Sequence, residues 1–171
     1  MSAEGGQDSR EGKMRRKVVI AGTMATVAAV GVVAVGAAEA STPTAAVPGR
    51  HITVVEHAVS DTVVDTGPKG DSRGDLLAFA NPVFNRGGTT RVGHDNGSCI
   101  RTVVGKAWEC SWTTQLAKGS LVVEGPFYDN RDSTLAITGG TGAYSQARGV
   151  MHLHARNAQG TAYTFGFIVQ R

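Results

Sequence analysis

The stretch LAITGGTGAYSQARG, residues Leu135 to Gly149, decides the fold of this chain. An apolar run leads into three glycines in four positions, Gly139, Gly140 and Gly142. A loop of this kind can hold a phosphate when a helix follows it. The residues that follow, MHLHAR at 151–156, instead alternate apolar and polar side chains with a period of two. The stretch therefore predicts a tight corner between two β-strands.

The rest of the chain repeats this pattern of short alternating segments and turn residues. The separators are rich in Gly, Asp, Asn and Pro, and no segment carries a sustained apolar stripe of helical period. Evenly spaced short strands indicate an all-β sandwich or a closed barrel. Eight strands are expected: His51–Val59, Gly74–Phe84, Arg91–Val103, Lys106–Leu116, Gly119–Tyr128, Ser133–Thr138, Gln146–Arg156 and Thr161–Val169.

The N-terminal forty of the 171 residues have the pattern of a signal peptide. A basic patch at Lys13–Lys17 precedes an uncharged Val/Ala/Gly run, Val18–Ala38, and Ala38-Glu39-Ala40 forms a small-x-small cleavage site. We expect cleavage after Ala40, and therefore a secreted protein. An uncleaved membrane anchor is the alternative, because the run is long enough to span a bilayer. Residues 41–50 are expected to be a flexible linker, and residues 51–171 the folded domain.

The charge of the expected mature chain does not favour a nucleic-acid partner. Residues 41–171 keep 12 Lys/Arg and 10 Asp/Glu, a net charge of +2 against +3 for the whole chain. No basic run is interleaved with aromatic residues, so nucleic-acid binding is not predicted.

The two cysteines, Cys99 and Cys110, flank a predicted hairpin turn at Val104-Gly105. A hairpin centred there places the two residues opposite each other on neighbouring strands, and exported proteins commonly form such bridges. We predict a Cys99–Cys110 disulfide. A free catalytic Cys99 is the alternative.

Two polar residues stand on otherwise apolar strand faces. Glu56 follows Ile52 and Val54 on the first strand, where burial would raise the pKa of its carboxyl and suit it to acid, base or charge-stabilising chemistry. A solvent-facing Glu56, or one paired with an arginine, is the alternative. Asn81 shares a face with Phe79 on the second strand. Its amide either ties down a neighbouring loop or presents its donors to a ligand.

The last strand carries Tyr163, Phe165 and Phe167 on one face, which forms either a core wall or the lining of an apolar pocket. His152 and His154 lie two residues apart on one strand face, a spacing that suits a metal ion. A metal site needs a third ligand, and nothing in the spacing selects one, so no metal site is predicted.

Several motifs, in order, resemble the allene oxide cyclase and dirigent superfamily. They are Gly74-Asp75-Leu76 continuing to Asn81, Val92-Gly93 followed by Gly97-x-Cys99, Glu124–Phe127, and Leu135–Gly142. The resemblance covers about residues 51–169 and implies an eight-stranded antiparallel β-barrel, commonly a homotrimer, with an apolar lumen and no cofactor.

The resemblance also implies roles for particular residues. Glu56 falls where the cyclases place a carboxylate that stabilises developing positive charge, Asn81 where an amide helps to hold a water, and Cys99 where a lumenal cysteine lies. Ala58 stands where the cyclases have an asparagine. An exported chain also resembles the dirigent proteins more than the organellar cyclases.

The predicted function is to bind a small hydrophobic substrate in the lumen and to steer its cyclisation or stereoselective coupling. Glu56 and Asn81 are the candidate catalytic residues, and Phe79, Tyr163 and Phe165 the candidate substrate-binding residues. The alternatives are a non-catalytic small-molecule carrier and a structural oligomeric barrel with a filled interior.

Overall fold

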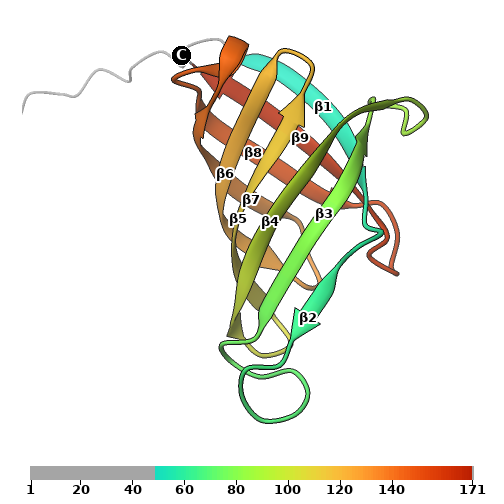
Figure 1. Cartoon of the computed structure of the whole chain (residues 1–171), viewed down its shortest axis with the longest axis vertical. Coiled ribbons are helices and arrows are strands. Elements are labelled where there is room, and N and C mark those ends of the chain that lie inside the picture. The colour runs from blue at the N-terminus through green and yellow to red at the C-terminus, as the bar shows by residue number, and fades with distance from the viewer. Residues whose placement is uncertain (1–48, 171) are drawn as a thin grey trace, which may run out of the picture. The chain divides into compact units, whose positions relative to one another are not determined.

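The computed structural model describes residues 49–170. The predicted signal peptide, its cleavage site and most of the predicted linker lie outside the described residues. Within them the chain forms nine strands and a single turn of 3₁₀ helix (Figure 1). The strands are β1 (Arg50–His57), β2 (Thr62–Val64), β3 (Leu76–Phe84), β4 (Arg91–Val103), β5 (Ala107–Leu116), β6 (Gly119–Tyr128), β7 (Ser133–Gly140), β8 (Arg148–Ala155) and β9 (Ala162–Gln170).

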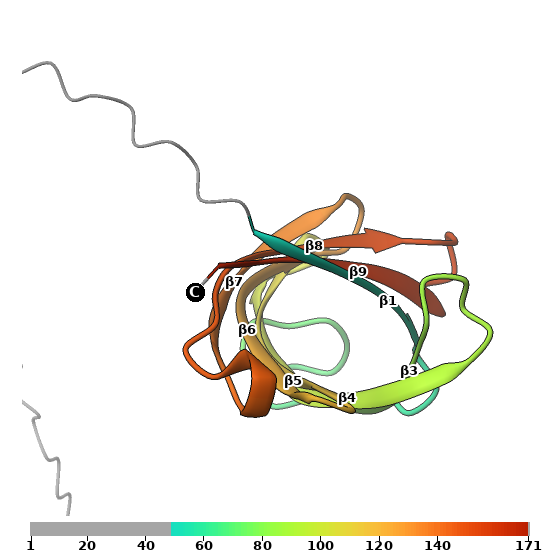
Figure 2. The ribbon, with the colours of Figure 1, turned by 90° about the horizontal axis from the view of Figure 1, so that it is seen from above.

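Eight of these strands close into an antiparallel β-barrel. Each pairs with its neighbour in the order β1-β9-β8-β7-β6-β5-β4-β3, and β1 also pairs with β3 through Val55–Phe84 and Glu56–Val83. The view from above shows the strands curving around a common interior (Figure 2). The predicted eight-stranded antiparallel barrel is therefore confirmed.

The ninth strand, β2, was not predicted from the sequence. It pairs only with β3, and its three residues are exposed on the barrel wall. Asp61 and Asp65 flank it, so no alternating pattern of useful length marks it. The loop after β2 is organised by Asp75, whose carboxyl accepts hydrogen bonds from the backbone N–H groups of Thr66 and Ser72 and from the Ser72 hydroxyl. Asp75 thus belongs to this loop, whereas the sequence placed it within the second strand.

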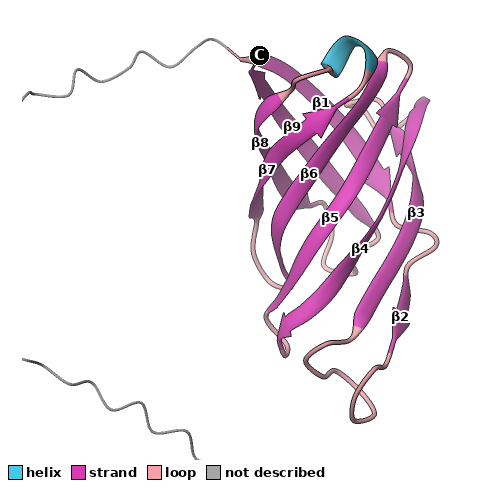
Figure 3. Ribbon diagram, turned by 60° about the vertical axis from the view of Figure 1, so that its left-hand side comes forward, coloured by secondary structure: helices cyan, strands magenta, loops and turns pink. Residues whose placement is uncertain are grey.

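The glycine-rich corner joins β7 to β8, as predicted, and contains the 3₁₀ turn Gly142–Tyr144 (Figure 3). Gly142 has a φ of +58°, and a Cβ atom there would lie 2.6 Å from the carbonyl oxygen of Lys118 in the β5–β6 turn. The backbone N–H of Thr141 donates to the carbonyl of Ser120 at 2.9 Å. Glycine is needed because two turns pack backbone against backbone at this end of the barrel.

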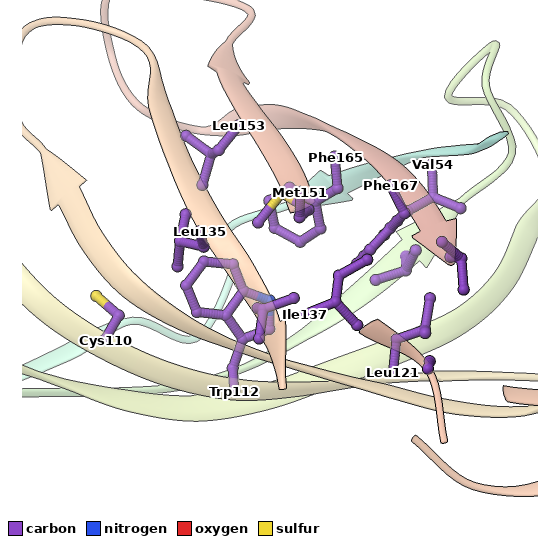
Figure 4. Close-up of a cluster of buried hydrophobic side chains, with 14 of the residues drawn as sticks. Val54, Cys110, Trp112, Leu121, Leu135, Ile137, Met151, Leu153, Phe165 and Phe167 are labelled. Carbon is purple, nitrogen blue, oxygen red and sulfur yellow. The ribbon is translucent and has the colours of Figure 1, made fainter. Parts of the chain in front are cut away.

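Apolar side chains fill the half of the barrel nearest this corner. Val54, Leu121, Ile137, Met151 and Phe167 are almost fully buried, and several of these side chains converge inside the ring of strands (Figure 4). Since alternate strand residues point inward, each strand contributes to this core with every second side chain. In residues 49–170 no helix has the length and apolarity needed to cross a membrane.

Candidate functional site

The other half of the barrel interior contains a cavity of about 60 Å³. Its walls are largely aromatic and aliphatic, and the Cys99–Cys110 disulfide also lines it. A cavity of this size holds a few water molecules or one end of a small organic molecule. The apolar lining residues are Leu77, Phe79, Trp112, Phe127, Leu153 and Phe165, and the polar ones are Glu56, Asp61 and Tyr163.

The disulfide prediction is confirmed, and with it the predicted hairpin. Cys99 on β4 and Cys110 on β5 are directly opposite each other, with their Cα atoms 4.0 Å apart. Val103 and Ala107 close the hairpin around Gly105, which has a φ of +63°. Cys99 therefore has no free thiol for catalysis.

Glu56 lies at the polar end of the cavity, on the inward face of β1, and its residue surface is only 5% exposed. The pKa of its carboxyl is raised to about 7, mainly by burial and also by the Asp61 carboxylate, against the opposing effect of a hydrogen bond from Asn81. The carboxyl is not paired with Arg101, whose guanidinium binds Asp71 and Asp129. A carboxyl that titrates near neutral pH can both give and take a proton.

Asn81 holds Glu56 and the loop after β1 together. Its Nδ2 group donates to Oε1 of Glu56 and to Oδ1 of Asp61, at 2.8 Å in each case. Its Oδ1 accepts from the backbone N–H groups of Val59 at 2.9 Å and Ser60 at 3.0 Å. Both amide protons are thus engaged by carboxylates. Of the two alternatives, the structure shows Asn81 tying down the loop, and its donors are not directed at the cavity.

Asp95 is a buried carboxyl that the sequence reasoning missed. It lies directly opposite Asn81, on the inward face of β4, and is fully buried. Neither carboxyl oxygen meets a donor in the described part of the chain. Burial, and then the charge of Glu56, raise the pKa of Asp95 to about 8. The available signal was its spacing, because Asp95 is four residues before Cys99 and shares its inward face.

The three predicted substrate-binding residues all line this cavity. The Phe79 ring meets Trp112 edge-on, with centroids 6.0 Å apart, and Trp112 packs against Phe165 at 5.6 Å. Tyr163 is half-buried and packs edge-on against Phe127 at 5.8 Å. Burial, followed by the charges of Glu56 and Asp61, raises the pKa of the Tyr163 phenol. Phe167, by contrast, is buried in the core and does not line the cavity.

A second, larger hollow of about 350 Å³ adjoins the inner cavity, and we call it the vestibule. It lies between the β6–β7 loop (residues 129–132) and the β8–β9 loop (residues 156–161). Three side chains, those of Phe127, Leu153 and Tyr163, line both spaces. The two hollows together therefore form one site with an apolar inner end and a polar outer end.

Arg101 fixes the loop that walls the vestibule. Its guanidinium binds Asp129 through both carboxylate oxygens, at 2.9 and 2.7 Å, and binds Asp71 at 2.6 Å. It also stacks over the Trp108 ring at 3.9 Å. This side chain therefore joins the β2–β3 loop to the β6–β7 loop at one end of the barrel.

His152 and His154, the pair whose spacing suits a metal, are on the outer wall of β8. His152 Nδ1 lies 3.1 Å from Thr134 Oγ1, and His154 Nδ1 lies 2.8 Å from a carboxylate oxygen of Asp132. Both histidines are exposed, and neither contributes to the cavity or the vestibule.

Comparison with known proteins supports the fold. No protein-family model matches the sequence. A pyocyanin demethylase is similar at 25% identity and a TM-score of 0.59, over 68% of this chain and 98% of that one. The chain has a dirigent- and cyclase-like barrel fold. A pterocarpan synthase dirigent protein is 19% identical with a TM-score of 0.61, over 70% of this chain and 83% of that one. The Diels–Alderase AbmU from Streptomyces koyangensis is 10% identical with a TM-score of 0.53, over 71% of this chain and 67% of that one.

Proposed function

We propose that this barrel binds a small hydrophobic substrate in its lumen and steers the cyclisation or stereoselective coupling of that substrate. The observation that carries the proposal is the position of Glu56, a buried carboxyl at the polar end of an aromatic cavity. Such a group can protonate a substrate oxygen, or stabilise positive charge as it develops, in a site with largely apolar walls.

The apolar walls would supply the rest of the effect. A flexible substrate held between the rings of Phe79, Trp112 and Phe165 adopts a small set of conformers, and the reactive one is favoured by shape. The roles proposed for the predicted residues follow from their positions. Glu56 acts on the substrate, Asn81 orients Glu56, and Phe79, Tyr163 and Phe165 bind apolar surface.

The dimensions of the two hollows set the expected size of the substrate. The inner cavity of about 60 Å³ holds one apolar end, and the vestibule of about 350 Å³ receives the remainder. Small-molecule sites generally span about 300–1,000 Å³. We therefore expect an elongated molecule whose apolar end passes Tyr163 and whose polar end lies beside Asn130 and Asn157.

The wider setting is also a proposal. Export is supported by the leader pattern of residues 1–40 and by the disulfide, which is characteristic of oxidising compartments. A homotrimer, a cofactor-free reaction and allene oxide cyclase activity in particular rest on the resemblance of the sequence motifs alone.

A pair of substitutions on β3 tests lumenal binding. Leu77 lines the cavity, and its neighbour Leu76 is 40% exposed on the outer wall of the same strand. We expect Leu77→Trp to weaken binding of the neutral fluorophore Nile red at least tenfold, and Leu76→Trp to leave it unchanged. Equal affinity in both variants would place the binding site elsewhere and overturn the proposal.

A second experiment separates an enzyme from a carrier. Mass spectrometry of small molecules retained by the purified protein identifies the compound to assay. We expect Glu56→Gln to lower turnover of that compound at least a hundredfold while its affinity changes little. An unchanged product mixture in Glu56→Gln, with binding retained, would instead support the non-catalytic carrier.

A further inference from the structure

The wall behind the cavity contains a row of polar side chains in which the donors and acceptors do not balance. Asn81 and Asp95 are opposite each other across β3 and β4, and Asp95 is opposite Thr114 across β4 and β5. Asn81 uses its amide protons on Glu56 and Asp61. Neither Asp95 oxygen meets a donor, and Thr114 Oγ1 also has no partner in the described part of the chain.

An ionised carboxylate in the position of Asp95 would be very unfavourable. Asp95 is fully buried, and the transfer of an unpaired charge from water into the protein interior costs far more free energy than the transfer of a neutral group. The titratable group that acts most strongly on Asp95 is Glu56, also a carboxyl, so two negative charges would repel each other inside the barrel. One proton held between them removes a charge and supplies the missing donor to an Asp95 or Glu56 oxygen.

We propose that Glu56 and Asp95 share one proton in the folded barrel, and that Asp95 is the positioning residue that keeps this proton available to Glu56. The catalytic role of this shared proton rests on the proposed function. Glu56 lines the cavity, whereas Asp95 does not, so Asp95 acts through Glu56 and not on the substrate.

The surroundings of the pair favour retention of the proton near neutral pH. The pKa of Glu56 is about 7 and that of Asp95 about 8, and burial is the largest cause of both shifts. The charged or titratable neighbours are Asp61, which raises both values, and Tyr163, whose own pKa the carboxylates raise. Among residues 49–170, no cationic side chain contributes to either shift. Because the groups interact, the two titration steps belong to the pair.

A shared proton would give this barrel both an acid and a base without a cofactor. Glu56 donates the shared proton to a substrate oxygen. Both carboxyls are then ionised, and the positive charge gained by the substrate beside Glu56 offsets the added negative charge. The proton then returns from the substrate to the pair when the ring or bond has formed. The net reaction consumes no proton, as an isomerisation requires.

Infrared spectroscopy of the ligand-free protein tests the proposal without any substrate. In wild-type protein we expect the C=O band of a protonated carboxyl to persist at pH 7 and to disappear in a single step at higher pH, when the shared proton is lost. The proposal would be overturned if every such band had already disappeared when the pH is raised to 6. This measurement does not depend on turnover, so a failure of the proposed function leaves its result unaffected.

Two substitutions assign the band to the pair. Asp95→Asn and Glu56→Gln each leave one carboxyl beside an amide, so the remaining group should titrate at least about one pH unit lower. The controls are Thr114→Val, which removes the neighbouring hydroxyl, and Asp132→Asn, which removes an exposed carboxyl. Neither should move the band. Titrations of Asp95→Asn and Glu56→Gln that match wild type would overturn the proposal, and the wild-type titration decides it if either variant fails to fold.

The pH dependence of activity gives the second readout. With the retained compound as substrate, Asp95→Asn should shift the upper limb of the pH–rate profile downward by about the same amount as the infrared titration. An equal loss of rate at every pH, with no shift of the profile, would show that Asp95 is only structural.

Discussion

The side-chain amide of Asn81 donates a 2.8 Å hydrogen bond to Oε1 of Glu56, a residue 25 positions earlier in the chain. The same amide binds Asp61, and its oxygen binds the backbone of Val59 and Ser60. One side chain thus links the carboxyl at the polar end of the cavity to the loop beside it. The orientation of Glu56 and the order of that loop should therefore change together.

Asn81→Ala should destabilise the protein by roughly 2–4 kcal/mol, because it leaves two backbone N–H groups and a buried carboxyl without partners. Denaturant unfolding measures the loss, and hydrogen exchange at Val59 and Ser60 should accelerate. Asn96→Ala is the matched control, since Asn96 is exposed on β4, and it should change stability by less than about 0.5 kcal/mol. Equal effects of the two substitutions would contradict this role.

Stability should fall as pH rises from about 4 to about 8. The pKa values of Glu56 and Asp95 are raised in the folded state, so the folded protein holds protons that the unfolded chain releases in this range. Each unit of pKa shift corresponds to about 1.4 kcal/mol, so a decline of a few kcal/mol is expected. Asp75, whose pKa is lowered, acts in the opposite direction, below about pH 4.

Chemical unfolding at a series of pH values measures this decline, and Asp95→Asn should flatten it. Stability that stays constant or rises between pH 5 and pH 8 in wild type would mean that the pair ionises freely.

Reduction of the Cys99–Cys110 disulfide should lower the free energy of unfolding by about 3 kcal/mol, because a closed loop spanning 11 positions restricts the unfolded chain. Cys99→Ser combined with Cys110→Ser should show the same loss without reductant. Mass spectrometry should record a gain of two hydrogens on reduction, and an alkylating reagent should label the protein only afterwards. Labelling of the untreated protein would show a free thiol.

Arg101→Lys should loosen the β6–β7 loop and cost about 1–3 kcal/mol, because lysine cannot reproduce the two-oxygen contact to Asp129 or the stack on Trp108. Hydrogen exchange in residues 129–132 should accelerate, and Nile red affinity should change with the shape of the vestibule. Arg91→Lys is the control, because Arg91 is exposed on β4 and lines neither hollow. Equal or larger effects from Arg91→Lys would exclude Arg101 as the anchor of this loop.

The strands were predictable because each carries its own alternating pattern. Arg91–Val103 and Gly119–Tyr128 were predicted with the bounds that the structure gives, and other strand ends differed by a few residues. The exposed strand Thr62–Val64 was missed, because it has too few residues to show a period. The Cys99–Cys110 pair was predictable because a hairpin brings residues of short separation together.

The site was only partly predictable. Glu56 and Asn81 stood out as polar residues on apolar faces, and both are buried. The sequence did not show that both amide protons of Asn81 are bound within the protein. One of them binds Asp61, which lies in a loop whose path depends on the fold. Asp95 was missed because glycines and polar residues surround it on β4, so no apolar face marked it as buried.

The sequence by itself determined the eight strands of the barrel, the glycine corner and the disulfide, since these follow from local alternation, turn residues and short-range pairing. Tertiary structure decided the chemistry of the lumen. Closure of β1 against β3 brings Glu56 beside Asn81 and, through the next strand, beside Asp95. The burial and mutual repulsion that raise the two carboxyl pKa values exist only inside the closed ring, where water cannot screen them.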